Sequence, residues 1–216
     1  MKKFTCILIV GFAFLMIASP VLAQDTGTTK DIRFTIKTNP LSALGGPLFV
    51  LWVVPLTAEY KVYFEAKTSA SQSVQIGLGY LGSSPLVASM GDLGGDTTIS
   101  SNGIHAQLWY KFFLTGDRAP AGFYIGPHFS YATAKLKNNK RPDEFFKASK
   151  LNIDVAFGYQ VITRGGFALD VYTGLGLKNK KFDTSSLSAN QTFSDWKLNN
   201  KTTIGVPFGF SFGYAF

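Results

Sequence analysis

The last stretch of the chain constrains its fold more than any other. From Ile204 to Phe216 every second residue is large and apolar, and the residues between them are small or proline. This strict alternation predicts one extended strand with an aromatic face and a nearly bare face. Strands of soluble sheets usually run about five to six residues, whereas crossing a bilayer takes roughly 9–11 tilted residues. The length and the aromatic face together predict a strand that contacts lipid.

The beginning of the chain has the pattern of a targeting segment. Lys2 and Lys3 precede an apolar run, and small residues at the cleavage positions end with Ala23. We predict a signal peptide over residues 1–23, because the run is short for the alternative, an uncleaved anchor helix. The only cysteine, Cys6, lies inside it, so no disulfide or thiol chemistry is expected in the mature chain.

Seven further alternating segments precede the last strand. They span residues 32–44, 48–65, 72–81, 104–112, 123–131, 151–160 and 167–177. Long polar stretches at 82–103, 135–149 and 179–200 alternate with short turns, as in outer-membrane barrels with an even strand count. The sequence therefore predicts an all-β fold, an eight-stranded antiparallel up-and-down transmembrane β-barrel over residues 32–216, after a flexible lead at 24–31. The apolar run 48–54 does not fit a polar connection and could extend the second strand.

The alternation leaves open which face points inward. A lipocalin-like barrel would bury its apolar face and turn its polar face to water. Here the polar face carries Gly, Ala, Ser and Tyr as often as charge, and aromatic residues lie near the strand ends of the apolar face, which suits a lipid interface. We therefore predict a lumen that holds the polar set Arg33, Lys37, Glu59, Lys61, Gln75, His105, Gln107, Lys111, His128, Asp154, Gln160 and Asp170.

Eight strands leave an interior that side chains can fill. The predicted lumen is thus a closed network of salt bridges, and a narrow pore is the alternative. His105 and His128 fall on adjacent strands, but two histidines without further ligands do not make a metal site. We expect no metal and no cofactor.

The formal net charge is +8, of which residues 24–216 carry +6. The positive residues cluster at 135–150, 178–181 and 197–201. A nucleic-acid partner is not expected for an exported chain. Basic loops beside anionic lipopolysaccharide, or charged loops that only contact water, account for these clusters better.

The signal peptide, the eight strands, the rhythm of turns and loops and the terminal Phe resemble the small outer-membrane β-barrel families. The phrase IKTNPLSAL at 36–44 resembles the opening strand of such proteins from Bacteroidota-type bacteria. The resemblance implies a porin-like cell-envelope protein of a Gram-negative bacterium, in contact with outer-membrane lipid and lipopolysaccharide. It also implies recognition by the outer-membrane assembly machinery of the terminal aromatic residues Phe210, Phe212, Tyr214 and Phe216. We expect a monomer with a structural or surface-binding role through its outer loops.

An enzymatic alternative comes from His128-Phe129-Ser130, with Glu144 in the predicted loop that follows. A base, a hydroxyl and an orienting acid are the parts of a serine hydrolase. The motif resembles the His-x-Ser of outer-membrane lipid A deacylases, which are also eight-stranded barrels. Two features depart from those enzymes: Tyr131 stands where they usually have Asn, and the predicted strand faces turn His128 and Ser130 into the lumen. The non-enzymatic hypothesis is therefore preferred to a deacylase-like esterase.

Overall fold

The computed structural model of the protein describes residues 32–43, 49–51, 54–55, 57–83, 99–114, 119–138, 141–184 and 201–216. The predicted signal peptide and flexible lead lie outside these ranges. Within the ranges, no helix is both long and apolar enough to cross a membrane.

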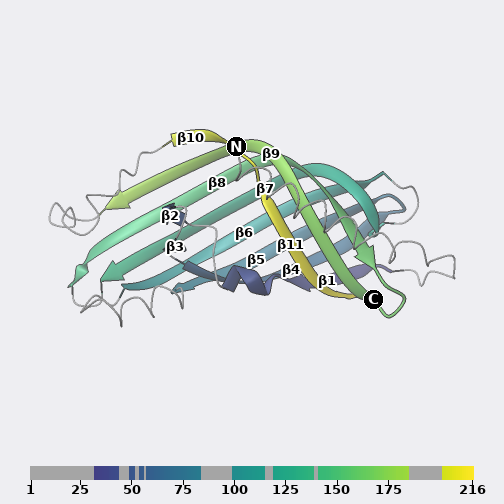
Figure 1. Cartoon of the computed structure of the whole chain (residues 1–216), viewed down its shortest axis with the longest axis horizontal. Coiled ribbons are helices and arrows are strands. Elements are labelled where there is room, and N and C mark those ends of the chain that lie inside the picture. The colour runs from purple at the N-terminus through teal and green to yellow at the C-terminus, as the bar shows by residue number, and fades with distance from the viewer. Residues whose placement is uncertain are drawn as a thin grey trace, which may run out of the picture. The chain divides into compact units, whose positions relative to one another are not determined.

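Eight antiparallel strands close into a barrel (Figure 1). In ring order they are β1 (Phe34–Thr38), β4 (Thr57–Ser69), β5 (Gln72–Ser83), β6 (Ile99–Phe113), β7 (Gly122–Asn138), β8 (Arg141–Ile162), β9 (Phe167–Thr184) and β11 (Phe208–Ala215). Pairing between β11 and β1, with Ile36 opposite Tyr214, completes the ring. The predicted eight-stranded antiparallel barrel is confirmed.

A further short strand, β10 (Lys201–Gly205), pairs with β9 outside the closed ring. Gly205 lies opposite Gly176 and Phe208 lies opposite Thr173, so β10 and β11 follow β9 in a single register. The predicted uninterrupted strand is wrong at residues 206–207, because Pro207 has no N–H to donate to a ladder. The Pro207 carbonyl instead accepts a hydrogen bond from the backbone N–H of Gly174 at 3.1 Å.

The first predicted strand, 32–44, is too long. β1 ends at Thr38, and the short 3-10 helix η1 (Pro40–Ala43) follows. The hydroxyl of Ser42 donates to the carbonyl of Glu59 on β4 at 2.8 Å, which holds η1 against that strand. Part of the apolar run 48–54 does not extend the second strand either: β2 (Phe49–Leu51) and β3 (Val54–Pro55) pair with each other in a separate small sheet.

The prediction of a loop at 135–149 is also wrong. β7 and β8 extend through this polar stretch, and only residues 139–140 separate them. Similarly, β6 begins at Ile99 and β9 continues to Thr184. The basic side chains of Lys137 and Lys147 lie on the exposed face, and their inward neighbours are small or apolar. The alternation of inward and outward side chains therefore continues through this lysine-rich stretch. The high number of lysines had suggested a loop there instead.

The two ends of the barrel differ in their connections. At one end, here called the turn end, β4 and β5 are joined at Ala70–Ser71, and β8 and β9 are joined at residues 163–166. Gly166 has φ of 86°, a backbone conformation that favours glycine, and its N–H donates to the Thr163 carbonyl at 2.9 Å. This confirms the short turn predicted between the segments 151–160 and 167–177. The opposite end, with the β7–β8 hairpin, is called the loop end.

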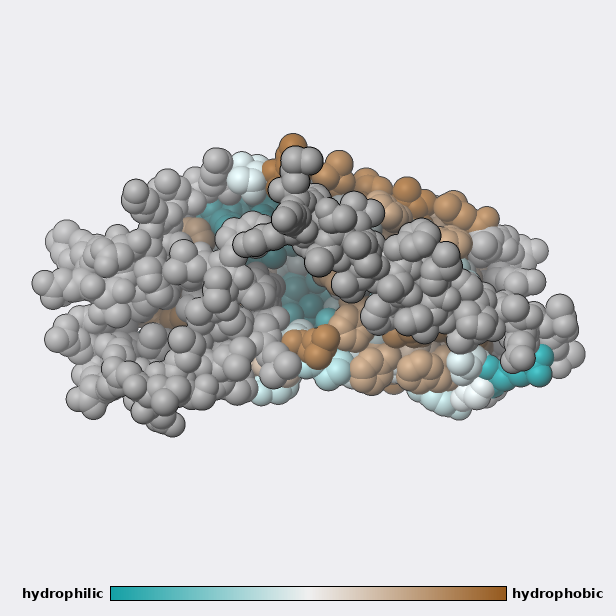
Figure 2. All heavy atoms as spheres, in the orientation of Figure 1, coloured by the Kyte–Doolittle hydropathy of each residue, from teal (hydrophilic) through white to brown (hydrophobic). Residues whose placement is uncertain are grey.

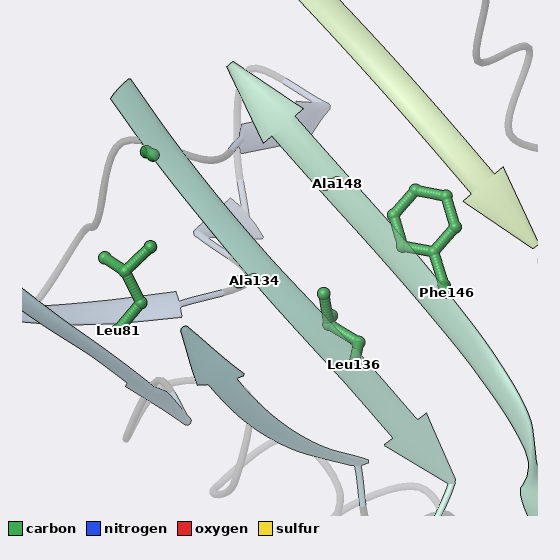
Figure 3. Packing of buried hydrophobic residues seen from close by; sticks show 6 residues of the cluster. Leu81, Ala134, Leu136, Phe146 and Ala148 are labelled. Carbon is green, nitrogen blue, oxygen red and sulfur yellow. The ribbon is translucent and has the colours of Figure 1, made fainter. Parts of the chain in front are cut away.

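Apolar side chains cover the outside of the barrel, and polar ones face inward. Figure 2 shows brown apolar residues on the outer surface and teal hydrophilic residues recessed between them. At the loop end part of the inward face is apolar as well. There β5, β7 and β8 bring together the buried residues Leu81, Ala132, Ala134, Leu136, Phe146 and Ala148 (Figure 3), with the Phe182 ring stacked 5.7 Å from that of Phe146.

Candidate functional site: the barrel lumen

A balanced cluster of charges fills the lumen near the turn end. Lys37 on β1 lies 2.6 Å from Glu65 on β4 and 2.8 Å from Asp170 on β9. Lys111 on β6 lies 2.8 Å from Asp170 and 3.4 Å from Glu65. All four side chains are at most 1% exposed. Two cations and two anions compensate one another where neither could be buried alone.

Neutral groups complete this cluster. The hydroxyls of Tyr124 and Ser73 donate to Asp170 and Glu65, each at 2.5 Å. The amide oxygen of Gln160 accepts from Lys37 at 2.6 Å and from Lys111 at 3.2 Å, and that of Gln75 accepts from Lys111 at 2.9 Å. The carboxylates are thus hydrogen-bonded as well as paired, as a stable buried ion cluster requires.

Aromatic rings occupy the lumen beside the ion cluster. The ring of Trp109 lies 5.3 Å from that of Tyr124, 4.7 Å from that of Tyr172 and 4.8 Å from that of His128. The bare face of the last strand makes room for them, because a Cβ on Gly209 would lie only 2.7 Å from the Tyr172 ring. Side chains therefore fill the barrel at this level.

A second cluster joins β4, β6 and β7. The imidazole Nε2 of His105 lies 2.7 Å from the hydroxyl of Ser130, and Nδ1 contacts the carboxylate of Glu59. Lys61 pairs with the same carboxylate at 2.8 Å. With its Nδ1–H donating to Glu59, His105 keeps Nε2 as the acceptor for the Ser130 O–H. A serine, a base and an orienting acid arranged in this order have the connectivity of a serine-hydrolase triad.

The predicted pairing of His128 with Ser130 does not form, since Ser130 bonds His105. His128 Nδ1 instead lies 2.9 Å from Asp154 Oδ1, while His128 Nε2 and Asp154 Oδ2 have no hydrogen-bond partner among the described residues. Glu144 was predicted in a loop but belongs to β8. No group of three or more His, Cys, Asp or Glu side chains in the described ranges could hold a metal ion.

A hollow of about 40 Å³ lies in the loop half of the lumen, at the break between β10 and β11. Lys150, Asn152 and Asp154 line it from β8, Lys178 lines it from β9, and residues 205–207 complete it. The predicted lumen set missed Lys150, Asn152 and Lys178. Asn152 lies within the predicted strand 151–160, on the same face as Asp154, whereas Lys150 and Lys178 lie just beyond the predicted strand ends, where the two-residue alternation continues.

The remaining predicted residues lie as follows. Arg33 precedes β1 and is exposed, so it is not part of the buried polar network. Gln107 is half-buried, between the inward-facing His105 and Trp109. Of the terminal aromatic residues, Phe212, Tyr214 and Phe216 are exposed and Phe210 is half-buried.

Together the fold and its interior define the class of the molecule: a closed eight-stranded antiparallel β-barrel with a polar, side-chain-filled lumen. Comparison with protein-family models, with curated proteins and with solved structures gave no match.

Proposed function

We propose that the protein is an outer-membrane barrel with a closed lumen, whose role is structural or surface-binding and is carried by its loop end. The observation that carries the proposal is the apolar outer face, to which every strand of the ring contributes. Its members include Ile36, Val62, Leu78, Leu108, Phe129, Val155, Leu175 and Phe208, each at least 46% exposed. Water-soluble proteins rarely expose a contiguous apolar patch larger than a few hundred Å², so a face of this extent favours lipid as the surrounding solvent.

The distribution of lysines supports a partner at the loop end. On β8 the outward face changes from the apolar Ile153 and Leu151 to Lys147, and on β9 it changes from Leu177 to Lys181. This basic collar, which also includes Lys137 on β7, lies just beyond the apolar belt. The phosphates of lipopolysaccharide would lie at this height in an outer membrane, and basic side chains there would attract them.

The filled lumen argues against the pore alternative. The ion cluster, the aromatic rings and the apolar cluster of Figure 3 occupy successive parts of the interior. Water-filled channels are typical of barrels with more strands. We therefore expect no stepwise conductance when the protein is inserted into planar bilayers.

Electrophoresis tests the membrane proposal. The protein folded in detergent is expected to migrate faster when unheated than after boiling, and to precipitate when detergent is withdrawn. A chain that stays soluble and monomeric without detergent would rule the proposal out. Conductance steps in bilayers would replace the closed barrel with a pore.

A second candidate function is ester hydrolysis at the acyl chains of lipopolysaccharide. One observation favours it: Ser130 contacts His105, and His105 in turn contacts Glu59. Burial counts against it, because the three residues are only 3–5% exposed. A fluorophosphonate probe would distinguish the candidates. The closed barrel predicts no labelling, whereas an adduct on Ser130 that His105→Gln abolishes and the control Ser149→Ala retains would establish the hydrolase.

A further inference from the structure

The outward faces of β7, β8 and β9 share one order of residues as they approach the loop end. On each strand the last apolar or aromatic residue of the belt is followed by a hydroxyl or amide residue and then by a lysine. The three series are Tyr131, Thr133 and Lys135 on β7, Leu151, Ser149 and Lys147 on β8, and Leu177, Asn179 and Lys181 on β9. The three strands are neighbours in the barrel (Figure 1). A molecule that lies along this surface therefore contacts an apolar layer, a neutral polar layer and a cationic layer in turn.

The lysines of the cationic layer lack acidic partners. Lys135 lies directly opposite Lys147 on the β7–β8 ladder, and like charges in this position destabilise a sheet. Asp183 lies opposite Lys147 on β9, but no carboxylate of the described residues forms an ion pair with these lysines or with Lys181. The Lys135 ammonium lies 3.7 Å from the centre of the Phe145 ring, a contact that holds the ammonium without neutralising it. Bound phosphate groups would compensate these charges, because a lysine ammonium donates strong hydrogen bonds to phosphate.

The middle layer presents hydroxyl and amide groups. Thr133 Oγ1 and Ser149 Oγ lie 3.0 Å apart, and Asn179 Nδ2 donates to Thr202 Oγ1 of β10 at 2.8 Å. Hydroxyl and amide groups have several donor and acceptor sites each, so these pairs keep capacity for further hydrogen bonds. A headgroup that carries a sugar between its acyl chains and its phosphates would match this layer.

The cationic layer covers one side of the barrel. Among the described residues of β4, β5 and β6 in the loop half, no outward-facing side chain is a lysine or an arginine, and Tyr60, Tyr80 and Asn102 lie on that face. Neighbouring strands lie about 4.8 Å apart, so Lys135 and Lys181 stand on strands roughly 10 Å apart. The site therefore has the width of one lipid headgroup and does not form a ring around the barrel.

We propose that the outward face of β7, β8 and β9 at the loop end binds one molecule of a phosphorylated glycolipid. Its acyl chains lie along the apolar layer, its sugars contact the hydroxyl and amide layer, and its phosphates accept hydrogen bonds from Lys135, Lys147 and Lys181. This chemistry is that of the lipid anchor of lipopolysaccharide. The site depends on the membrane location proposed above, since only a barrel in lipid has acyl chains beside these strands.

Native mass spectrometry of the full chain, folded in detergent micelles, tests the proposal. The probes are diphosphoryl lipid A, monophosphoryl lipid A and phosphatidylglycerol, each at the same mole fraction of the micelles. We expect one diphosphoryl lipid A per barrel, bound about fivefold more tightly than the monophosphoryl form, since one lysine beside an anionic lipid contributes about that factor. No retained lipid, or equal retention of phosphatidylglycerol, would overturn the proposal.

Charge variants locate the site. Lys147→Gln with Lys181→Gln is expected to weaken binding of diphosphoryl lipid A by about 25-fold, about fivefold for each lysine. The control is Arg33→Gln with Arg164→Gln, which removes the same charge from exposed positions at the turn end. Equal weakening by the control would mean general charge attraction and would overturn the site.

Thr133→Val tests whether the bound lipid carries a sugar. The substitution keeps the shape of the side chain and removes its hydroxyl, so it is expected to weaken binding of diphosphoryl lipid A and to leave that of phosphatidylglycerol unchanged. An equal effect on the two lipids would contradict the assignment to a glycolipid.

Failure of this site can be distinguished from failure of the proposed membrane barrel. The fold of each variant is checked by its heat-dependent migration. A protein that needs detergent and migrates in this way, but retains no lipid A, would reject the site and leave the membrane barrel intact. A protein that stays soluble and monomeric without detergent would reject both.

Discussion

Both halves of the lumen carry inward-facing lysines, but the groups that surround these lysines differ between the halves. Near the turn end, Lys37 and Lys111 each contact two carboxylates, and the cluster is closed to solvent. In the loop half, Lys150 and Lys178 line a hollow together with Asp154, whose carboxylate contacts His128, and Lys180 lies opposite Lys150 on the β8–β9 ladder. The same alternation thus produces a closed ion cluster where the neighbouring strands supply carboxylates, and a polar hollow where they supply further lysines.

Breaking the balanced half should have the largest effect. Asp170→Leu leaves Lys37 and Lys111 with a single carboxylate, and removing one partner of a buried ion cluster costs about 3–5 kcal/mol. We expect a corresponding loss of unfolding free energy in a urea titration followed by electrophoretic mobility. The double variant Asp170→Leu with Lys111→Met restores the balance between Lys37 and Glu65 and should recover part of the loss. A double variant less stable than Asp170→Leu would contradict the charge-balance account.

The next effect concerns the outer face that surrounds both halves. Leu108, on β6, is 52% exposed in the apolar belt. In a bilayer, Leu108→Lys is expected to destabilise the folded barrel by about 2–4 kcal/mol, the cost of a lysine near the midplane. Folding into lipid vesicles at graded urea concentrations measures it. The matched variant Leu108→Ala should cost less, and equal effects of the two would count against lipid contact.

Packing inside the filled half is tested at the last strand. Gly209→Ala would place a methyl group 2.7 Å from the Tyr172 ring, and overpacking of this kind costs about 1–3 kcal/mol. Gly165→Ala in the β8–β9 turn is the control, because the nearest atom lies 4.0 Å away and its backbone needs no positive φ. Similar unfolding curves for the two variants would show that the lumen is less filled than described.

The smallest effect belongs to the basic half. Lys180→Gln removes one of two opposed charges, so the barrel should gain a few tenths of a kcal/mol at low salt. The gain should shrink in high salt, because screening weakens the repulsion. Lys181→Gln on the exposed face is the control. If Lys180→Gln instead destabilises the barrel at low salt, the lysine has a stabilising partner and the like-charge account fails.

Much of the barrel could be predicted from alternation alone. Leu78, Leu108 and Phe129 on the outside and Lys37, Lys111 and Asp170 on the inside follow directly from the period of two. The strand ends could not be predicted, because Lys137 and Lys147 look like loop residues unless their inward neighbours Leu136, Phe146 and Ala148 are considered together with them. β1 ends early because η1 takes over at Pro40, a tertiary contact with β4 that no local pattern announces.

The contacts between side chains in the lumen were harder to predict than which side chains face the lumen. His128 and Ser130 lie two residues apart on one strand, and their proximity in sequence suggested a pair. Across the barrel, however, Ser130 meets His105 and His128 meets Asp154. Strand register and shear decide such contacts, and neither can be obtained from residue spacing along one strand.

Spin labels at two outward-facing positions, one on β6 and one on β9, test the central claim most directly. In a Cys6→Ser background, labels are attached at Leu108→Cys, on the outer face, and at Lys181→Cys, beyond the apolar belt, and the protein is folded into lipid vesicles. The account predicts that the label at 108 collides with dissolved oxygen and is shielded from a water-soluble nickel chelate, while the label at 181 is open to the chelate. Equal access of the chelate to both labels would contradict a lipid-facing barrel.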